Sequence, residues 1–179
     1  MRKAILALTV AATTAAFAAP VQAQAGLTFG LSGGVALPMG DAGDVLKTGL
    51  GGGAAIMMRD PSAKLGFGID AQYYRFSYDD ASIGGALNAR QNLYGVMARL
   101  DYSMGGMAYL LGGAGLFRGE ITGDDSAPDF SETTNTDFAI QAGLGLNFAR
   151  GLFAEAKYVN IFSDNSNTSF IPITVGIRF

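Results

Sequence analysis

The chain has 179 residues and a formal net charge of −3, with 26 glycines but no cysteine, histidine or tryptophan. The lack of cysteine excludes disulfides, thiolate metal sites and thiol nucleophiles, and the lack of histidine excludes the commonest general base and any Ser-His pair. The acidic balance, with no basic stripe, argues against nucleic-acid binding.

Residues 1–25 have the layout of a secretory signal peptide. A charged start at Arg2-Lys3 precedes an apolar run over about residues 4–19, and small residues allow cleavage after Ala23 or Ala25. The alternative is a membrane-anchoring helix, but the run is short for a span and rich in Ala and Thr. We therefore expect a cleavable leader.

Two regions follow from this reading, a signal peptide at 1–25 and one domain at 26–179. Loss of the leader lowers the net charge to −5, because two basic residues leave with it. An exported chain with a positive mean hydropathy of +0.26 favours a membrane barrel over a secreted soluble domain.

From residue 26 onward, large apolar side chains alternate with small or polar ones. This is the period of a β-strand, because successive side chains point to opposite faces. In chain order, the expected strands are 27–37, 50–58, 65–74, 94–102, 107–118, 138–148, 152–158 and 170–179. The strand at 107–118 is apolar on both faces, so the pattern does not orient it.

The connections between these strands alternate between long and short. Polar segments at 40–47, 77–90, 119–137 and 163–169 are the long ones, and short turns at 60–63, 103–106 and 150–151 separate them. Such alternation is typical of antiparallel strands whose two ends face different compartments. We predict an all-β fold, a closed eight-stranded antiparallel up-and-down transmembrane β-barrel.

Charged residues within the strands indicate which face points inward. Six of them lie opposite the aliphatic face, where a charge in contact with lipid would cost roughly 2–4 kcal/mol at mid-depth. They are Asp70, Arg99, Asp101, Glu155, Lys157 and Arg178. Three are acidic and three basic, so we predict a cross-strand charge network that fills the narrow lumen.

Tyrosines near the predicted strand ends suggest interfacial girdles, where the ring is apolar and the hydroxyl is wet. The residues assigned to these girdles are Tyr73, Tyr94, Tyr102, Tyr109 and Tyr158.

The last strand, Pro172-Ile-Thr-Val-Gly-Ile-Arg-Phe179, ends on an aromatic residue after alternating apolar positions. In this, and in its strand pattern over 26–179, the chain resembles the small eight-stranded outer-membrane barrels of the OmpA/OmpX and opacity types, a porin-like family. The resemblance implies a monomer in the outer membrane of a Gram-negative-type envelope. It also implies that Val175, Ile177 and Phe179 form the signal that the outer-membrane assembly machinery reads. The peptidoglycan-binding domain of longer OmpA-type members is absent, so we expect no cell-wall anchoring.

Other candidate sites have plainer explanations. The acidic connection at 119–137 lacks calcium-loop spacing and is interpreted as a solvated loop rather than a cation site. The inward carboxylates are better explained as salt-bridged filling than as an acid–base pair. Glycine runs at 51–53 and 112–113 lie inside strands and lack the lysine of a phosphate loop.

Two functions remain open. The first is a non-catalytic surface barrel, without cofactor or metal, that contributes to envelope integrity or to adhesion through its long extracellular loops. The alternative is a small-solute pore or a lipid-handling barrel, which an open lumen would distinguish. The expected partners are outer-membrane lipids, the assembly machinery and a surface ligand of the loops.

Overall fold

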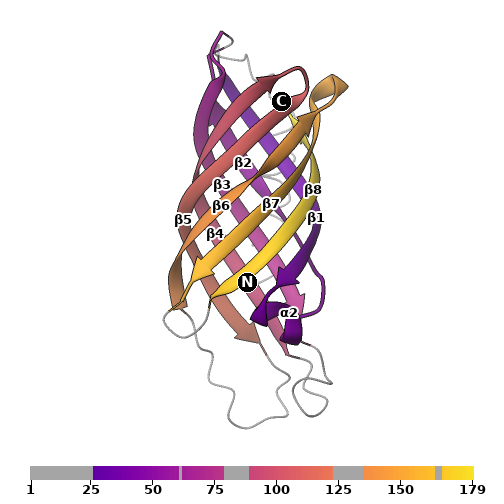
Figure 1. Ribbon diagram of the computed structural model, residues 1–179, viewed down its shortest axis with the longest axis vertical. Coiled ribbons are helices and arrows are strands. Elements are labelled where there is room, and N and C mark those ends of the chain that lie inside the picture. The colour runs from indigo at the N-terminus through magenta and orange to yellow at the C-terminus, as the bar shows by residue number, and fades with distance from the viewer. Residues whose placement is uncertain (1–25, 61, 79–88, 123–134, 164–166) are drawn as a thin grey trace, which may run out of the picture.

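The computed structural model describes residues 26–60, 62–78, 89–122, 135–163 and 167–179. The predicted leader lies outside these residues. Eight strands run obliquely around a closed barrel (Figure 1). They are β1 Leu27–Met39, β2 Gly49–Met58, β3 Leu65–Ser77, β4 Arg90–Gly105, β5 Ala108–Thr122, β6 Asn135–Asn147, β7 Leu152–Phe162 and β8 Thr168–Arg178. The predicted fold class is confirmed. Among the described residues, no helix is long and apolar enough to cross a membrane.

Each strand pairs antiparallel with the next, and β8 returns to β1. The β1–β8 register runs from Gly30 opposite Arg178 to Met39 opposite Ser169. Beyond it, Phe29 and Phe179 exchange two backbone hydrogen bonds of 2.9 Å each, and their rings stack at 6.3 Å. Closure leaves no sheet edge unpaired, which is the condition for a sheet to cross hydrocarbon.

The predicted alternation also sets the two faces of the wall. Large aliphatic side chains are exposed on the outside, for example Leu50 at 68%, Ile69 at 58% and Val175 at 67%, while the six predicted lumen charges face inward. The ends of the barrel differ. We call the end that adjoins 40–48, 78–89, 123–134 and 163–167 the loop end, and the opposite end the turn end.

Strand β5, which the sequence pattern left unoriented, turns Tyr109, Leu111 and Phe117 inward and Leu110 and Leu116 outward. The assignment of Tyr109 to an interfacial girdle was therefore wrong, because this residue is 1% exposed inside the barrel. Its hydroxyl has a partner there, in the carboxylate of Glu155. A tyrosine with a buried hydrogen-bond partner has no need of an interface.

Three connections contain more regular structure than expected. Strand β5 continues to Thr122, and β6 already begins at Asn135. Both ends of the predicted loop at 119–137 therefore belong to the sheet. The segment after β1 forms a short helix, α2 Asp41–Val45, which packs at the loop end of the barrel (Figure 1). Another one-turn element, η1 Ala149–Gly151, makes the turn before β7.

The β2–β3 turn has the predicted tight geometry at Asp60. Its carboxylate accepts hydrogen bonds from the backbone N–H and the hydroxyl of Ser62, at 2.8 and 2.5 Å. Because these bonds favour the charged form, they lower the pKa of Asp60 below its ordinary value.

Inward aromatic rings lie over inward glycines on the neighbouring strand. Directly paired residues show this four times: Gly51 with Tyr74, Gly95 with Phe117, Gly145 with Tyr109 and Gly176 with Phe153. A methyl group added at any of these glycines would run into the partner ring. The glycines thus provide the room that lets large rings fill a narrow lumen.

We expect Gly95→Ala to destabilise the barrel by about 1–3 kcal/mol, because the new methyl group overpacks the ring of Phe117. The matched control is Gly33→Ala, where the nearest atom to the new carbon is the Gly51 carbonyl oxygen at 3.8 Å. Urea unfolding of the refolded barrel in micelles, followed by gel mobility without heating, measures both. Equal stability of the two variants would contradict the packing argument.

We also predict that Phe179→Asp blocks assembly, because it removes the apolar aromatic end of β8 and its ring contact with Phe29. Phe179→Tyr keeps the ring and should assemble normally. The measurement is the amount of heat-modifiable protein in outer-membrane fractions, and normal yield of the aspartate variant would refute an assembly signal at Val175, Ile177 and Phe179.

Candidate functional site

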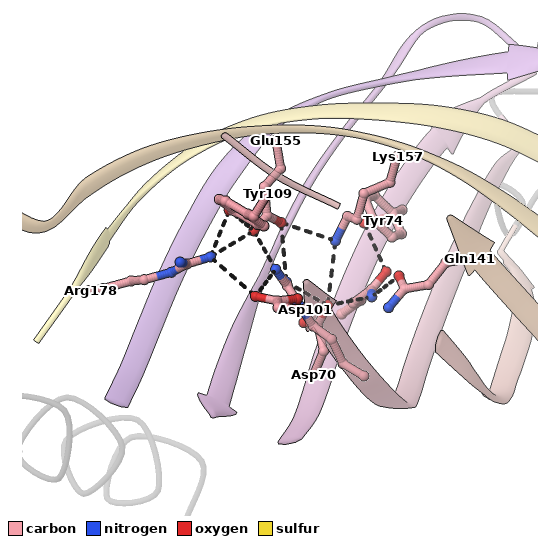
Figure 2. A network of polar contacts seen from close by, with 10 residues as sticks. Asp70, Tyr74, Asp101, Tyr109, Gln141, Glu155, Lys157 and Arg178 are labelled. Atoms are coloured by element: carbon pink, nitrogen blue, oxygen red, sulfur yellow. Dashed lines mark hydrogen bonds and ion pairs between the residues drawn. The ribbon is translucent and has the colours of Figure 1, made fainter. Parts of the chain in front are cut away.

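The six predicted lumen charges meet in one layer of the barrel interior, where ion pairs link them. Figure 2 shows this layer and labels five of them, all but Arg99. They come from four of the eight strands, β3, β4, β7 and β8. Five of them are at most 4% exposed, and the side chain of Arg178 is 18% exposed. We call these six residues the lumen charge network: Asp70, Arg99, Asp101, Glu155, Lys157 and Arg178.

Arg99 is the centre of the network. Its Nε donates to Asp101 Oδ1 at 2.7 Å and its Nη2 donates to Glu155 Oε1 at 2.6 Å, so the guanidinium joins β4 to β7 across the lumen. A third carboxylate, that of Asp70, lies 3.6 Å from Nη1. A buried guanidinium needs this number of acceptors, since its five N–H groups have left water.

Lys157 provides a second buried positive charge next to two of the carboxylates. Its Nζ lies 3.4 Å from Asp70 Oδ2 and 3.9 Å from Glu155 Oε2. Asp70 is therefore shared between Lys157 and Arg99, which lie on different strands. Each carboxylate of the network contacts at least two cations, so removal of one side chain leaves others without full compensation.

Arg178 closes the network toward the turn end. Its Nη2 lies 3.1 Å from Glu155 Oε1, and it donates to the Tyr109 hydroxyl at 2.6 Å. Its Nη1 donates to Asn147 at 2.9 Å, and its guanidinium lies over the rings of Tyr109 and Phe153 at 4.7 and 4.5 Å. These contacts fix the charged side chain of the last residue of β8 inside the lumen.

Three polar residues that sequence reasoning left out of the network extend it toward the loop end. Gln72 donates to Asp70 and to the Gln141 carbonyl oxygen, both at 2.8 Å, and accepts from the Tyr74 hydroxyl at 3.0 Å. The amide nitrogen of Gln141 has no partner among the described residues. Both glutamines were on the predicted inward face, so their position in the pattern was a usable signal.

Tyr109 is a fourth residue missed by sequence reasoning. Its hydroxyl accepts a hydrogen bond from Arg178 and donates one to Glu155 Oε1 at 2.6 Å. The tyrosine thus links the guanidinium of one residue to the carboxylate of the other. No pattern within β5 showed this role, because both faces of the strand are apolar.

Above the charged layer, on its loop-end side, lies a cluster of buried apolar side chains. The ring of Phe170 packs edge-on against Tyr74, Phe76 and Phe117 at 4.9, 5.5 and 6.3 Å. Met97 and Val159, both 0% exposed, fill the space beside these rings. Ala42 and Leu46, from α2 and the residue after it, join the same cluster from the loop end.

Small cavities lie near both mouths of the described lumen. One of about 150 Å³ lies at the loop end beside Leu93, Phe117 and Ile161, and one of about 70 Å³ lies at the turn end beside Arg59, Asp101 and Arg178. Between them lie the apolar cluster and the lumen charge network, whose side chains water barely reaches. The arrangement resembles a filled core rather than a channel.

The carboxylates of the network are not arranged for acid–base catalysis. Asp101 and Glu155 both bind Arg99, and Glu155 also accepts from Tyr109, so their oxygens are occupied by protein donors. Among the described residues, no group of three side chains is placed to hold a metal ion. Most of the acidic connection that was interpreted as a solvated loop, residues 123–134, lies outside the described residues.

A family model described as outer membrane protein beta-barrel domain matches residues 4–179. No curated protein sequence matches the chain.

Three solved structures illustrate the likeness. Neisserial surface protein A is 16% identical, with a TM-score of 0.57 over 86% of this chain and 96% of that one. The attachment invasion locus protein Ail of Yersinia pestis, solved with the heparin analogue sucrose octasulfate, is 16% identical, with a TM-score of 0.56 over 86% and 97%. The N-terminal β-barrel domain of Pseudomonas aeruginosa OprF is 16% identical, with a TM-score of 0.57 over 85% and 97%. At this identity the likeness shows the fold.

Substitution of Arg99 tests the energetic role of the network. Arg99→Leu leaves Asp101 and Glu155 buried without their main cation, and we expect a loss of about 3–5 kcal/mol in unfolding free energy. The control is Arg118→Leu on the exposed outer face of β5, which should change stability little. Urea unfolding in micelles measures both, and a fully stable Arg99→Leu variant would contradict the compensation argument.

Proposed function

Because the chain belongs to the outer membrane protein beta-barrel domain family, we propose that it acts as a non-catalytic, non-conducting surface barrel. Its place is the outer membrane of a Gram-negative-type bacterium. The proposed role is a contribution to envelope integrity, or to surface adhesion, through the outer wall and the long loops.

The observation that carries this proposal is the filled lumen. A charged layer held together by Arg99 and an aromatic layer around Phe170 lie one above the other across the barrel interior. Eight strands enclose a space just wide enough for side chains, so little room is left beside these two layers. A solute would have to displace buried ion pairs, which is costly in so dry a space.

The chemistry of the chain supports a role without catalysis. It has no histidine or cysteine, and the inward carboxylates are held by arginine, lysine and tyrosine. Within the lumen charge network, neither a nucleophile with an activating base nor a free acid–base pair is available. The work of the protein is therefore assigned to its exterior.

The exterior at the loop end supports a surface role. Four connections leave the barrel there, and the two longest strands, β4 and β5, each carry one of them. The structural neighbours include a surface protein and an attachment protein solved with a heparin analogue. Loops are the parts of such barrels that meet the surroundings, because strands and lumen are fixed by packing.

The alternative, a small-solute pore, is tested by conductance. We expect the purified protein to give no large, steady single-channel current in a planar bilayer, while a sixteen-stranded porin reconstituted in parallel conducts through its aqueous channel. Heat-modifiable gel mobility of the same sample shows that the barrel is folded. Steady conductance from the folded protein would overturn the non-conducting part of the proposal.

A further inference from the structure

Two cavities adjoin each other at the loop-end mouth of the lumen. One, of about 150 Å³, lies between the inward faces of β4, β5, β6, β7 and β8. The other, of about 160 Å³, lies between α2, Tyr78 and the loop-end residues of β4 and β8. Gln91 and Thr168 line both cavities, so we treat the two as one space and call it the mouth site. Figure 1 shows α2 beside this end of the barrel.

The floor of the mouth site is apolar. Leu93, Phe117 and Ile161 line it, and each is at most 5% exposed. Below them, the ring of Phe170 packs edge-on against Phe117 at 6.3 Å, and Met97 is 0% exposed. A molecule in the mouth site would therefore rest on these side chains without passing further into the lumen.

The rim of the mouth site is polar. Its side chains come from four strands and the residue after one of them, and they are Gln91, Asn135, Asp137, Ser163 and Thr168. Asp137 on β6 is directly opposite Phe117 on β5, so the carboxylate stands beside the apolar floor. The Cβ atoms of such a cross-strand pair are about 4.5–5.5 Å apart. An apolar pocket with a few polar groups is the usual form of a site for a small molecule.

Asp137 differs from the other carboxylates that face inward from the described strands. Asp70, Asp101 and Glu155 each contact at least two cations, whereas the half-buried Asp137 has no ion pair with a described residue. Asp41 of α2, which lines the second cavity, has no such ion pair either. Because a carboxylate that has partly left water is costly without a partner, a cation brought by a ligand is favoured here.

The remaining connections of the loop end contribute acidic rather than basic groups. Segments 79–88, 123–134 and 164–166, which lie outside the described residues, contain two, four and one acidic residues and no lysine or arginine. Arg75, Arg90 and Arg118 are exposed on the outer face of the wall, and no basic residue of the described chain lines either cavity. The charge of this region therefore favours a positively charged ligand.

We propose that the mouth site binds a small organic cation, a primary ammonium group joined to a single apolar ring. An apolar cavity of about 150 Å³ is large enough for benzene, so the floor has room for one ring. The ammonium group can donate charge-assisted hydrogen bonds to Asp137, and the oxygens of Gln91 and Thr168 are further acceptors on the rim.

A metal ion fits the mouth site less well than an organic cation does. Calcium requires about six to eight oxygen ligands, and within the described chain no three acidic side chains are grouped to hold a metal ion. A metal ion would also leave the apolar floor unused. The inference goes beyond the surface role proposed above, and it is compatible with a closed lumen because the ligand enters and leaves by the same mouth.

The test is a titration of the folded, nitrogen-15-labelled protein in phosphatidylcholine nanodiscs with 2-phenylethylammonium, read from amide chemical shifts. The amides of Gln91, Asp137 and Thr168 should shift and saturate, with a Kd on the order of 0.1–1 mM for a ligand of this size. 2-Phenylethanol has the same ring without the charge and should bind at least about tenfold more weakly. Methylammonium has the charge without the ring and should give no saturable shift at the same concentrations.

Two variants separate the role of the charge from the role of the space. Asp137→Asn removes the charge at nearly constant size and should weaken binding at least about tenfold. Gly119→Leu fills the cavity, because the first added carbon lies 3.5 Å from Leu93, an ordinary contact, and should abolish binding. The matched control is Glu120→Gln, which removes a carboxylate from the adjacent outward position of β5 and should bind as the wild type does. Heat-modifiable mobility shows that each variant is folded, and either of the first two decides the question if the other does not fold.

The proposal is overturned if a folded Asp137→Asn or Gly119→Leu variant binds 2-phenylethylammonium as tightly as the wild type, or if the neutral alcohol binds equally well. It is also overturned if Glu120→Gln loses as much affinity as Asp137→Asn, because the ligand would then respond to loop-end charge in general. Shifts confined to outward-facing amides such as those of Val96 and Leu116 would place the ligand in the lipid and refute the site. So would the absence of any saturable shift at about 10 mM.

Discussion

Transfer of charge out of water into the lumen is the constraint on which the rest of this structure depends. Arg99 is buried inside a barrel whose outer face meets hydrocarbon, and it is stabilised there by Asp101 on its own strand and Glu155 across the lumen. These contacts are favourable only if β3, β4, β7 and β8 keep the register that brings the six charged residues to one level. A slip of one residue in any of these strands would turn its charges toward lipid, so the network specifies the register as well as filling the space.

The same narrowness governs the apolar half of the lumen. Of the four rings above the charged layer, two lie opposite glycines on a neighbouring strand, Phe117 opposite Gly95 and Tyr74 opposite Gly51, and these glycines leave room for them. Glycine weakens a strand by conformational entropy, and here ring packing offsets that cost. The outer wall differs from the lumen: it carries an apolar belt, a row of tyrosines and, at the loop end of three strands, exposed arginines. The interior provides stability, and the exterior is what the surroundings can contact.

The strand pattern made most of this predictable from the sequence. A period of two, read over eight segments, predicted the closed barrel, and the six charged residues on the small-residue face predicted which side chains lie in the lumen.

The features that the sequence did not predict have physical reasons. Strand β5 is apolar on both faces because one face meets lipid and the other meets aromatic rings, so Tyr109 was assigned to an interface. Strands β5 and β6 run beyond the membrane belt, where polar residues such as Glu120 and Asn135 resemble loop, and α2 is too short to leave a helical period. The pairs of a ring with a glycine depend on the register between neighbouring strands, and the pattern within a single strand does not reveal that register.

The central claim is that oppositely charged side chains stabilise one another inside the lumen, and a double-mutant cycle between Arg99 and Glu155 tests it most directly. Unfolding free energies of the wild type, Arg99→Leu, Glu155→Leu and the double variant in the same micelles give the coupling between the two side chains. The account predicts that the double variant is more stable than the sum of the single effects implies, by at least about 2 kcal/mol. Additive effects would contradict it, because they would mean that the two groups do not compensate each other in the folded barrel.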